Sequence, residues 1–235
     1  MNINSSTLLT GSSSGLGKYL LENLNCQAFD RENLNKKYKD IRTIIHCGWD
    51  DDLVLEDMEY LSYSNLIFDK LASLRPKKFV FFSSISVYPK FTKELLDENL
   101  IIDLREVTGI SAISKVFIEN RIRNQIPNHL IIRSSTLIGK YSQNSIIKLL
   151  RNQKISLSKN SEMNIIRYEH VLEFLSKSQN LQGTFNLVSK KNIKILKINK
   201  NLSLFGYYEY NCGYLNSKKI NTVIDTKTSE ENYKI

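Results

Sequence analysis

Apolar residues gather in short runs that are typical of buried strands. The runs lie at residues 7–10, 26–29, 43–47, 78–83 and 129–133. The run at 43–47, TIIHC, has a continuous apolar centre, as a strand needs when helices cover both of its faces. The runs therefore predict a sheet that is shielded from water on both sides.

Helical spacing of apolar residues appears between these runs. One helix follows the first run and carries Leu16, Leu20, Leu21 and Leu24. Further helices are predicted over residues 53–74, 110–124, 145–151 and 168–178. Strand and helix alternate five times, and this order predicts an α/β fold with a Rossmann-type doubly wound parallel sheet.

The remaining segments are less regular. Residues 91–108 are expected to be loop with some helix, and 163–167 and 183–188 short strands. The polar tail at 226–235 is expected to fray. We therefore expect a dinucleotide-binding domain over residues 1–140. A small C-terminal α+β substrate lobe over 141–235 would be partly interleaved with it.

Composition narrows the class of protein. The 235 residues are 41% hydrophobic and 24% charged, which is ordinary for a globular protein. No apolar run is long enough to span a membrane, and the N-terminus lacks the pattern of a signal peptide. We therefore expect a cytoplasmic protein. The three cysteines have no pairing motif and are expected to be reduced, and no metal site is expected.

The net charge of +9 is compatible with anionic partners of several kinds. The lysines are spread along the chain, however, and no arginine-rich stripe accompanies them. Scattered lysines usually form a solvated surface. We therefore expect neither nucleic acid nor a membrane as a partner.

The first loop, TGSSSGLG at residues 10–17, has the composition of a phosphate-binding turn. Glycines there permit a tight turn, close approach of a diphosphate, and close packing of helix on strand. The helix that follows offers free N–H groups and a partial positive charge to phosphates. The cofactor contacts expected in this loop are Thr10, Gly11, Ser13, Ser14, Gly15, Leu16 and Gly17.

Two charged residues end the second predicted strand. The Asp30 carboxylate can accept hydrogen bonds from both hydroxyls of an adenosine ribose, which favours NAD. The neighbouring Arg31 can instead hold the 2′-phosphate of NADP. NAD is slightly favoured, and both cofactors stay open.

Several further motifs follow the loop in a fixed order: IIHCGW (44–49), FVFFSSISVYP (79–89), SAISK (111–115), HLIIRSSTLIGKY (129–141) and NIIRYEHVLEFL (164–175). Together they resemble the extended short-chain dehydrogenase/reductase proteins, the NAD-dependent epimerase/dehydratase family. The resemblance covers roughly residues 5–190. It implies an NAD(P)-dependent enzyme that modifies a nucleotide-linked sugar, for surface polysaccharide synthesis, as an epimerase, dehydratase or reductase.

The resemblance also implies site residues. The cofactor would be lined by His46, Cys47 and Gly48, and Arg133 would close over the nicotinamide end. Ser84 would hydrogen-bond the reacting oxygen, and Lys115 would hold the nicotinamide ribose.

The family's active-site tyrosine is replaced by Ser111. A serine hydroxyl has a far higher pKa than a phenol, so Ser111 and Lys115 form a poor acid/base pair. The one Tyr-x-x-x-Lys in the chain, YLNSK at 214–218, lies outside these motifs. Tyr88 and Tyr141 are the tyrosines near the motifs that might substitute. The alternative function is therefore an NAD(P)-binding or regulatory protein without hydride chemistry.

Four further expectations concern the length of one unit, a dimer interface and two groups of aromatic residues. The stretch between Asp30 and the third strand is short, so one strand–helix unit is expected to be cut down. By resemblance, helices 53–74 and 110–124 would pair across a homodimer interface.

Trp49 is expected to pack in the core or border the cofactor. The tyrosines at 207–214 are expected to line a pocket, a core or an interface.

Overall fold

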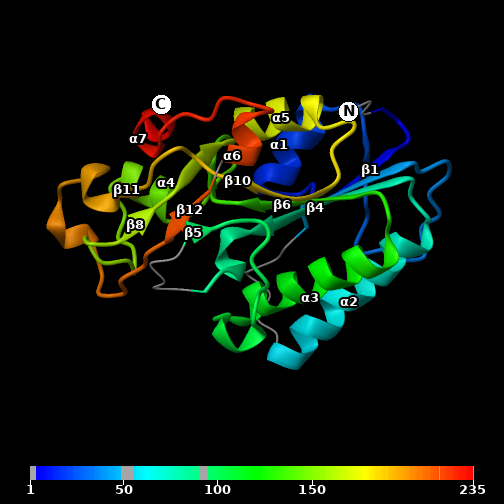
Figure 1. The fold of residues 1–235 in the computed structure, drawn as a ribbon, viewed down its shortest axis with the longest axis horizontal. Coiled ribbons are helices and arrows are strands. Elements are labelled where there is room, and N and C mark those ends of the chain that lie inside the picture. Colours follow the sequence, from blue (N-terminus) through cyan, green and yellow to red (C-terminus); the bar gives the residue numbers. More distant parts are fainter. Residues whose placement is uncertain (1–3, 49–55, 90–94, 217, 235) are drawn as a thin grey trace.

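The computed structural model describes residues 4–48, 56–89, 95–216 and 218–234. At its centre lies a six-stranded sheet in the order β10-β6-β4-β3-β1-β2, with every neighbouring pair parallel (Figure 1). The strands are β1 (Thr7–Thr10), β2 (Gln27–Ala28), β3 (Thr43–His46), β4 (Lys78–Ser84), β6 (His129–Ser134) and β10 (Gly183–Leu187). The predicted doubly wound parallel sheet is confirmed.

The strand order reverses next to β1. The chain passes from β1 outward to β2, then crosses back to β3 on the other side of β1. Residues 31–42 between β2 and β3 contain no helix or strand, so the predicted loss of a strand–helix unit is confirmed. The carboxyl ends of β1 and β3 flank the reversal, which is where doubly wound sheets bind their ligands.

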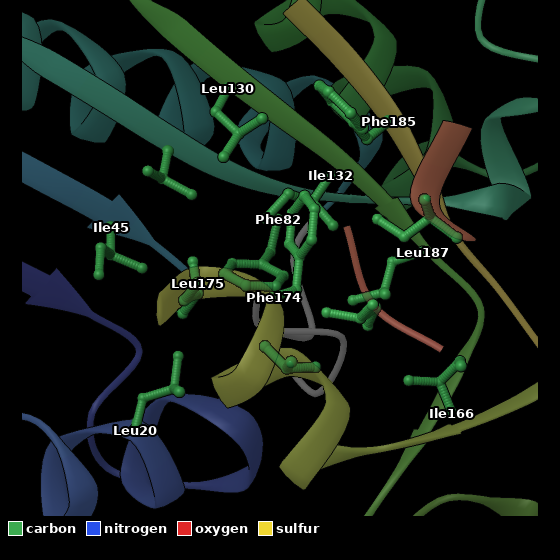
Figure 2. Packing of buried hydrophobic residues seen from close by; sticks show 14 of the residues in the cluster. Leu20, Ile45, Phe82, Leu130, Ile132, Ile166, Phe174, Leu175, Phe185 and Leu187 are labelled. Atoms are coloured by element: carbon green, nitrogen blue, oxygen red, sulfur yellow. The ribbon is translucent and has the colours of Figure 1, made fainter. Parts of the chain in front are cut away.

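Helices cover both faces of the sheet. α1 (Gly15–Asn23), α5 (Tyr168–Lys177) and α6 (Lys218–Asn221) lie on one face, and α2 (Asp57–Ser73) and α3 (Ile110–Gln125) on the other (Figure 1). Figure 2 shows Leu20 of α1 and Phe174 of α5 packed beside strand residues such as Phe82. Burying each such side chain contributes about 1.5–3 kcal/mol. Two apolar layers therefore fix the sheet, as the consecutive apolar positions predicted.

α2 begins with a capping box in which the Glu56 side chain accepts from the backbone of Glu59 and the Glu59 side chain accepts from the backbone of Glu56. The predicted helix over 53–74 is present from residue 57, and residues 53–55 lie outside the described part of the chain. Within that part, no helix combines the length and apolar character that a membrane crossing requires.

The C-terminal lobe is built from short elements around its own apolar cluster. Its helices and strands are β7 (Thr136–Ile138), α4 (Ser145–Leu150), β8 (Glu162–Met163), β9 (Ile165–Arg167), β11 (Ile193–Lys194), η3 (Ile195–Lys197), η4 (Leu202–Leu204) and α7 (Ser229–Tyr233). Four further short elements are η1 (Ile85–Val87), β5 (Leu95–Leu96), η2 (Leu104–Glu106) and β12 (Tyr214–Leu215), and β12 pairs with β5. β10 and α5 belong to this part of the sequence, but β10 joins the main sheet and α5 packs on one of its faces.

The expectation that the tail frays is wrong for its described residues. α7 begins at a capping box between Thr228 and Glu231, and Ser229 and Asn232 are fully buried. The Ser229 hydroxyl accepts a hydrogen bond from the backbone N–H of Ile165 (3.0 Å), and the Asn232 amide donates to the Ile165 carbonyl (2.7 Å). Polar residues in the tail thus bind the backbone of β9, which a hydropathy pattern does not reveal.

One buried lysine ties the sheet to the end of α5. The Lys78 ammonium donates to the carbonyls of Ser178 (2.8 Å), Gln179 (2.8 Å) and Leu181 (3.1 Å). The Lys78 side chain is buried, and burial lowers the pKa of Lys78. A cation at the C-terminal end of a helix satisfies carbonyls that have no partner within the helix.

Replacement of this ammonium should destabilise the fold. Lys78→Met keeps the apolar stem but leaves buried carbonyls without a donor, which costs about 2–3 kcal/mol. Urea unfolding measures the difference, and the exposed neighbour gives the control, because Lys77→Met should change stability by less than about 0.5 kcal/mol. Equal effects of the two substitutions would contradict the capping role of Lys78.

Candidate dinucleotide site

A pocket of about 220 Å³ lies at the carboxyl ends of β1, β2 and β3. It opens where the strand order reverses, so its place in the fold is that of a ligand site. Its lining residues are Thr10, Gly11, Ser12, Ser13, Phe29, Asp30, Arg31, Glu32, His46, Gly48, Tyr63 and Ile67. Thr10 to Ser13 of the glycine loop and the Asp30–Arg31 pair, predicted separately from the sequence, thus line one cavity. His46 and Gly48 line it too, whereas the other expected cofactor contacts at the start of α1 and Cys47 are not among its lining residues.

Backbone packs on backbone around the glycine loop. A Cβ on Gly17 would lie 2.1 Å from the Gly11 carbonyl oxygen, and a Cβ on Gly11 would lie 2.8 Å from the Gly48 Cα. Gly11 also has φ +72°, in the left-handed region. Larger residues at these positions would separate α1 from the strands. The glycines therefore allow the start of α1 to lie directly beside the pocket.

The first turn of α1 presents unbonded amides. Ser14 is the N-cap in extended conformation, and its side chain makes no capping hydrogen bond. A Cβ at Gly15 would meet only the Tyr168 hydroxyl, at an ordinary contact distance of 3.6 Å. Leu16 follows in the same turn. Exposed N–H groups and the helix dipole together favour an anion at this position.

A hydrogen-bonded triplet joins the loop to the end of β3. The Thr10 hydroxyl lies 2.6 Å from His46 Nδ1 and accepts the Gly48 N–H at 2.9 Å. Burial, with the nearby charge of Lys115, lowers the pKa of His46 to about 4. The imidazole is therefore neutral at pH 7, and it positions Thr10 without adding charge to the pocket. Cys47 lies beside this triplet as a free thiol whose pKa is raised by burial.

The Asp30 carboxylate is held by its own loop. Its Oδ1 accepts the N–H groups of Glu32 (3.1 Å) and Asn33 (3.2 Å), and its Oδ2 lies 4.0 Å from the Lys36 ammonium. A carboxylate has about four acceptor positions, so these contacts orient it and leave capacity for a ligand. Arg31 lines the same pocket beside Asp30.

The predicted catalytic residues lie beyond the lining of this pocket. Ser84 ends β4, and its hydroxyl accepts the Ser86 N–H at 3.1 Å. The Lys115 ammonium donates to the Ser111 hydroxyl at 2.9 Å, one turn apart on α3. Lys115 is buried, and its charge reaches His46. The Ser111–Lys115 pair is thus formed, with a serine where the resemblance calls for a tyrosine.

Both tyrosines named as substitutes are occupied elsewhere. The buried Tyr88 hydroxyl lies 2.7 Å from Asn186 Oδ1 and 2.8 Å from the Asp97 carbonyl oxygen, and its one proton is shared between these two acceptors. The Tyr141 hydroxyl donates to the Glu22 carboxylate on the exposed side of α1. Neither hydroxyl is directed to Lys115 by these contacts.

Arg133 is buried below the sheet instead of opening toward the pocket. Its guanidinium contacts the Glu119 carboxylate at 2.8 and 3.1 Å and donates to the Tyr88 hydroxyl at 3.1 Å. Glu119 also accepts from Ser83 (2.5 Å) and Arg123 (2.6 Å). The cofactor role of Arg133 stays a prediction, and the contacts in hand give Arg133 a structural role.

Sequence reasoning missed several lining residues. Tyr63 and Ile67 stand one turn apart on α2 and close the pocket beside Phe29. Their helical spacing was visible, but it indicated only a buried face. Ser12 lies in the predicted loop and was left out of the expected contacts. Trp49 lies outside the described residues.

No protein-family model matches this sequence, and no curated protein matches it significantly. Solved structures match it over nearly its whole length. A dTDP-4-dehydrorhamnose reductase from Bacillus anthracis, in complex with NADP, has a TM-score of 0.75 at 18% identity, covering 99% of this chain and 98% of that one. A UDP-N-acetylglucosamine 4-epimerase from Methanobrevibacter ruminantium has a TM-score of 0.75 at 14% identity, covering 98% and 96%.

A UDP-glucuronic acid 4-epimerase from Bacillus cereus, in complex with NAD, has a TM-score of 0.71 at 14% identity, covering 97% of this chain and 95% of that one. At such identities the likeness concerns the fold. The predicted resemblance to extended short-chain dehydrogenase/reductase structures is confirmed at that level, and two of these three structures contain NADP or NAD.

The buried pair of Glu119 and Arg133 makes a prediction about stability. Burial alone would raise the pKa of Glu119, but hydrogen bonds and charge from Arg133, with Ser83 and Arg123, hold that pKa below its usual value. A lowered pKa stabilises the fold above the unfolded value of about 4.3, and the contribution is lost as pH falls. Glu119→Gln should lower the free energy of unfolding by about 3 kcal/mol at pH 7.

Urea unfolding at pH 7 and in the acid range tests this. The cost of Glu119→Gln should begin to shrink below about pH 4, where the unfolded carboxylate takes up a proton, and should continue to fall until the native carboxylate is protonated too. Glu106→Gln, on an exposed side chain, is the control and should have little effect at either pH. A cost that stays constant across this range would contradict the ionised pair.

Proposed function

We propose that the chain binds a nicotinamide dinucleotide in this pocket, with NAD slightly favoured over NADP. The observation that carries the proposal is the shared lining of one cavity by the glycine loop and Asp30. The amides of Gly15 and Leu16 would hold the diphosphate, and Asp30 would accept the adenosine ribose hydroxyls. Tyr63 and Ile67 supply apolar surface for the adenine ring.

The packing of the glycine loop also leaves room for a nicotinamide dinucleotide. Gly11, Gly17 and Gly48 pack closely with one another and with Thr10, and they add no side chain beside the start of α1. Thr10 and His46 hold that arrangement without a competing charge. A bound nicotinamide would supply the hydride donor or acceptor, and the protein would supply orientation.

For the reaction, we propose modification of a nucleotide-linked sugar by transient hydride transfer, as an epimerase, dehydratase or reductase. The support is the fold shared with enzymes of these names, together with Ser84 and Lys115. Ser84 would hydrogen-bond the reacting sugar oxygen, and Lys115 would hold the nicotinamide ribose. A cytoplasmic role in making sugars for surface polysaccharides follows from the same likeness.

A second candidate is a binding or regulatory protein without hydride chemistry. Ser111 favours it, because a serine hydroxyl cannot hold and release the proton that a phenol exchanges near pH 7. The contacts of Tyr88 and Tyr141 favour it too, since both hydroxyls are engaged away from Lys115. Under this candidate the pocket still binds the dinucleotide.

We also propose a homodimer through α2 and α3, the helices that the resemblance predicted to pair between subunits. They pack side by side on one face of the sheet (Figure 1). Met58, Leu66 and Phe117 are large apolar residues exposed on these helices, at 72%, 51% and 45%. Burial of such side chains against a second copy is favourable.

The cofactor preference is tested at Asp30. Asp30→Asn keeps the oxygen that binds the loop amides but removes the charge that the ribose hydroxyls would meet. NAD should bind about tenfold more weakly, because charge-assisted hydrogen bonds contribute about 1.5–3 kcal/mol. NADP should bind equally well or better. Isothermal titration gives both affinities, with Asp40→Asn as an exposed control in the same loop. An unchanged ratio of the two affinities would refute the ribose contact.

Ser111→Tyr separates the two candidate functions. Restoring a phenol one turn from Lys115 should raise NAD(P)H turnover with a nucleotide 4-keto sugar by about a hundredfold, the usual contribution of general acid catalysis. Ser111→Phe, which lacks the hydroxyl, is the matched control. Equal turnover in the unaltered chain would remove the second candidate. No turnover in any variant, despite dinucleotide binding, would remove the first.

A further inference from the structure

Positive charge is distributed unevenly between the two parts of the chain. Residues 1–140 hold 18 Lys and Arg against 17 Asp and Glu, which nearly cancel. Residues 141–235 hold 15 against 7, and so carry almost all of the net charge. An asymmetry of this size indicates an anionic partner for one end of the molecule.

Much of this charge is gathered at one end by the fold. Residues 148–160 and 197–208, here named the basic tip, are far apart in sequence but lie side by side. Backbone bonds join Ile155 N–H to the Leu204 carbonyl (2.9 Å) and Ser158 N–H to the Tyr208 carbonyl (2.7 Å). The Asn199 side chain bridges to Leu149 and Asn152. Lysines that appear scattered along the sequence thus share one surface.

The basic tip contains no aspartate or glutamate. Its six cations are all exposed: Lys148, Arg151, Lys154, Lys159, Lys197 and Lys200. The nearest acids in sequence, Glu162 and Glu209, mark its edge, and Glu162 lies opposite Lys194 across the β8–β11 pair. The exposed cations of the tip repel one another. Binding of an anionic surface would reduce this repulsion.

Large apolar side chains project from the same tip. Tyr207 is fully exposed, and Leu202, Tyr208 and Leu150 are 58%, 51% and 38% exposed. Tyr208 and Leu150 stand at the edges of the two segments, among the lysines. A surface that exposes both lysines and apolar rings can bind charge and apolar material together.

We propose that the basic tip docks the protein on an anionic lipid membrane. Lysines bind phospholipid headgroups as point charges, and tyrosine is favoured at the boundary between headgroups and acyl chains. Leu150 and Leu202 would enter the apolar layer, whereas neither can stack on a base. Five of the six cations are lysines, and nucleic-acid recognition relies more on the planar fork of arginine. The tip therefore fits lipid better than nucleic acid, and the expectation of no membrane partner is revised.

No residue that lines the dinucleotide pocket belongs to the tip. In Figure 1 the orange segment at the left end carries residues near 200, and β1 lies at the right. Membrane docking through the tip would leave the pocket accessible. The inference is independent of the proposed function, because no residue of the pocket takes part in it.

Vesicle sedimentation of the full chain tests the proposal. The protein should bind vesicles that contain phosphatidylglycerol, bind those of phosphatidylcholine alone weakly, and be released by salt, since the Debye length falls from about 8 Å to about 3 Å between 0.15 and 1 M. The triple variant Lys154→Glu, Lys197→Glu, Lys200→Glu should bind more than about tenfold more weakly. Leu202→Ser with Tyr207→Ser should weaken binding at unchanged net charge.

The control has the same change of charge elsewhere. Lys37→Glu, Lys39→Glu, Lys77→Glu alters three exposed lysines near the opposite end and should bind vesicles far better than the tip variant. Equal loss in both triple variants would overturn the proposal, because overall charge would then explain binding. Salt-sensitive retention on RNA without binding to anionic vesicles would also overturn it, in favour of nucleic acid. Binding to neither would remove the docking role.

Discussion

The start of α1 lies so close to the strands that backbone meets backbone, and the site depends on this contact. Gly17 packs on the Gly11 carbonyl, and Gly11 packs on Gly48 at the end of β3. These distances leave no space for a Cβ. Packing alone therefore requires glycine at these positions, whether or not a ligand binds. The same contact brings the first amides of α1 to the edge of the pocket, where an anion is favoured. The hydrogen bonds of Thr10 with His46 and Gly48 hold the two strands in register behind it.

The sequence predicted the features that follow from local patterns. Consecutive apolar residues identified the central strands, and the glycine spacing identified the loop, because each depends on neighbours in the chain. The short stretch after Asp30 correctly indicated a missing strand–helix unit. Features that depend on distant partners were not visible. The tail was expected to fray, yet Asn232 binds the backbone of β9, and Tyr63 reaches the pocket from a helix that the pattern marked only as buried.

Arg133 illustrates how a motif can match while its contacts differ. Arg133 ends the predicted strand at 129–133, and the resemblance implied a place over the nicotinamide, which stays a prediction. The fold adds a contact with the buried Glu119 carboxylate of α3. The Glu119 partner could not be assigned from sequence, because both residues are separated by a turn and a strand. Ser111 is the opposite case. The replacement of tyrosine by serine was visible in the sequence, and the structure adds the hydrogen bond that Lys115 donates to it. The molecule thus combines a pocket lined by the glycine loop with a Ser111–Lys115 pair on α3, and most of its net charge lies in residues 141–235.

The central claim concerns where a diphosphate lies. A crystal structure of the purified chain grown with NAD tests it most directly. The account predicts the diphosphate against the amides of Gly15 and Leu16, and the adenosine ribose hydroxyls within hydrogen-bond distance of Asp30. An empty pocket at a saturating concentration of NAD, or NAD bound away from the glycine loop, would contradict it.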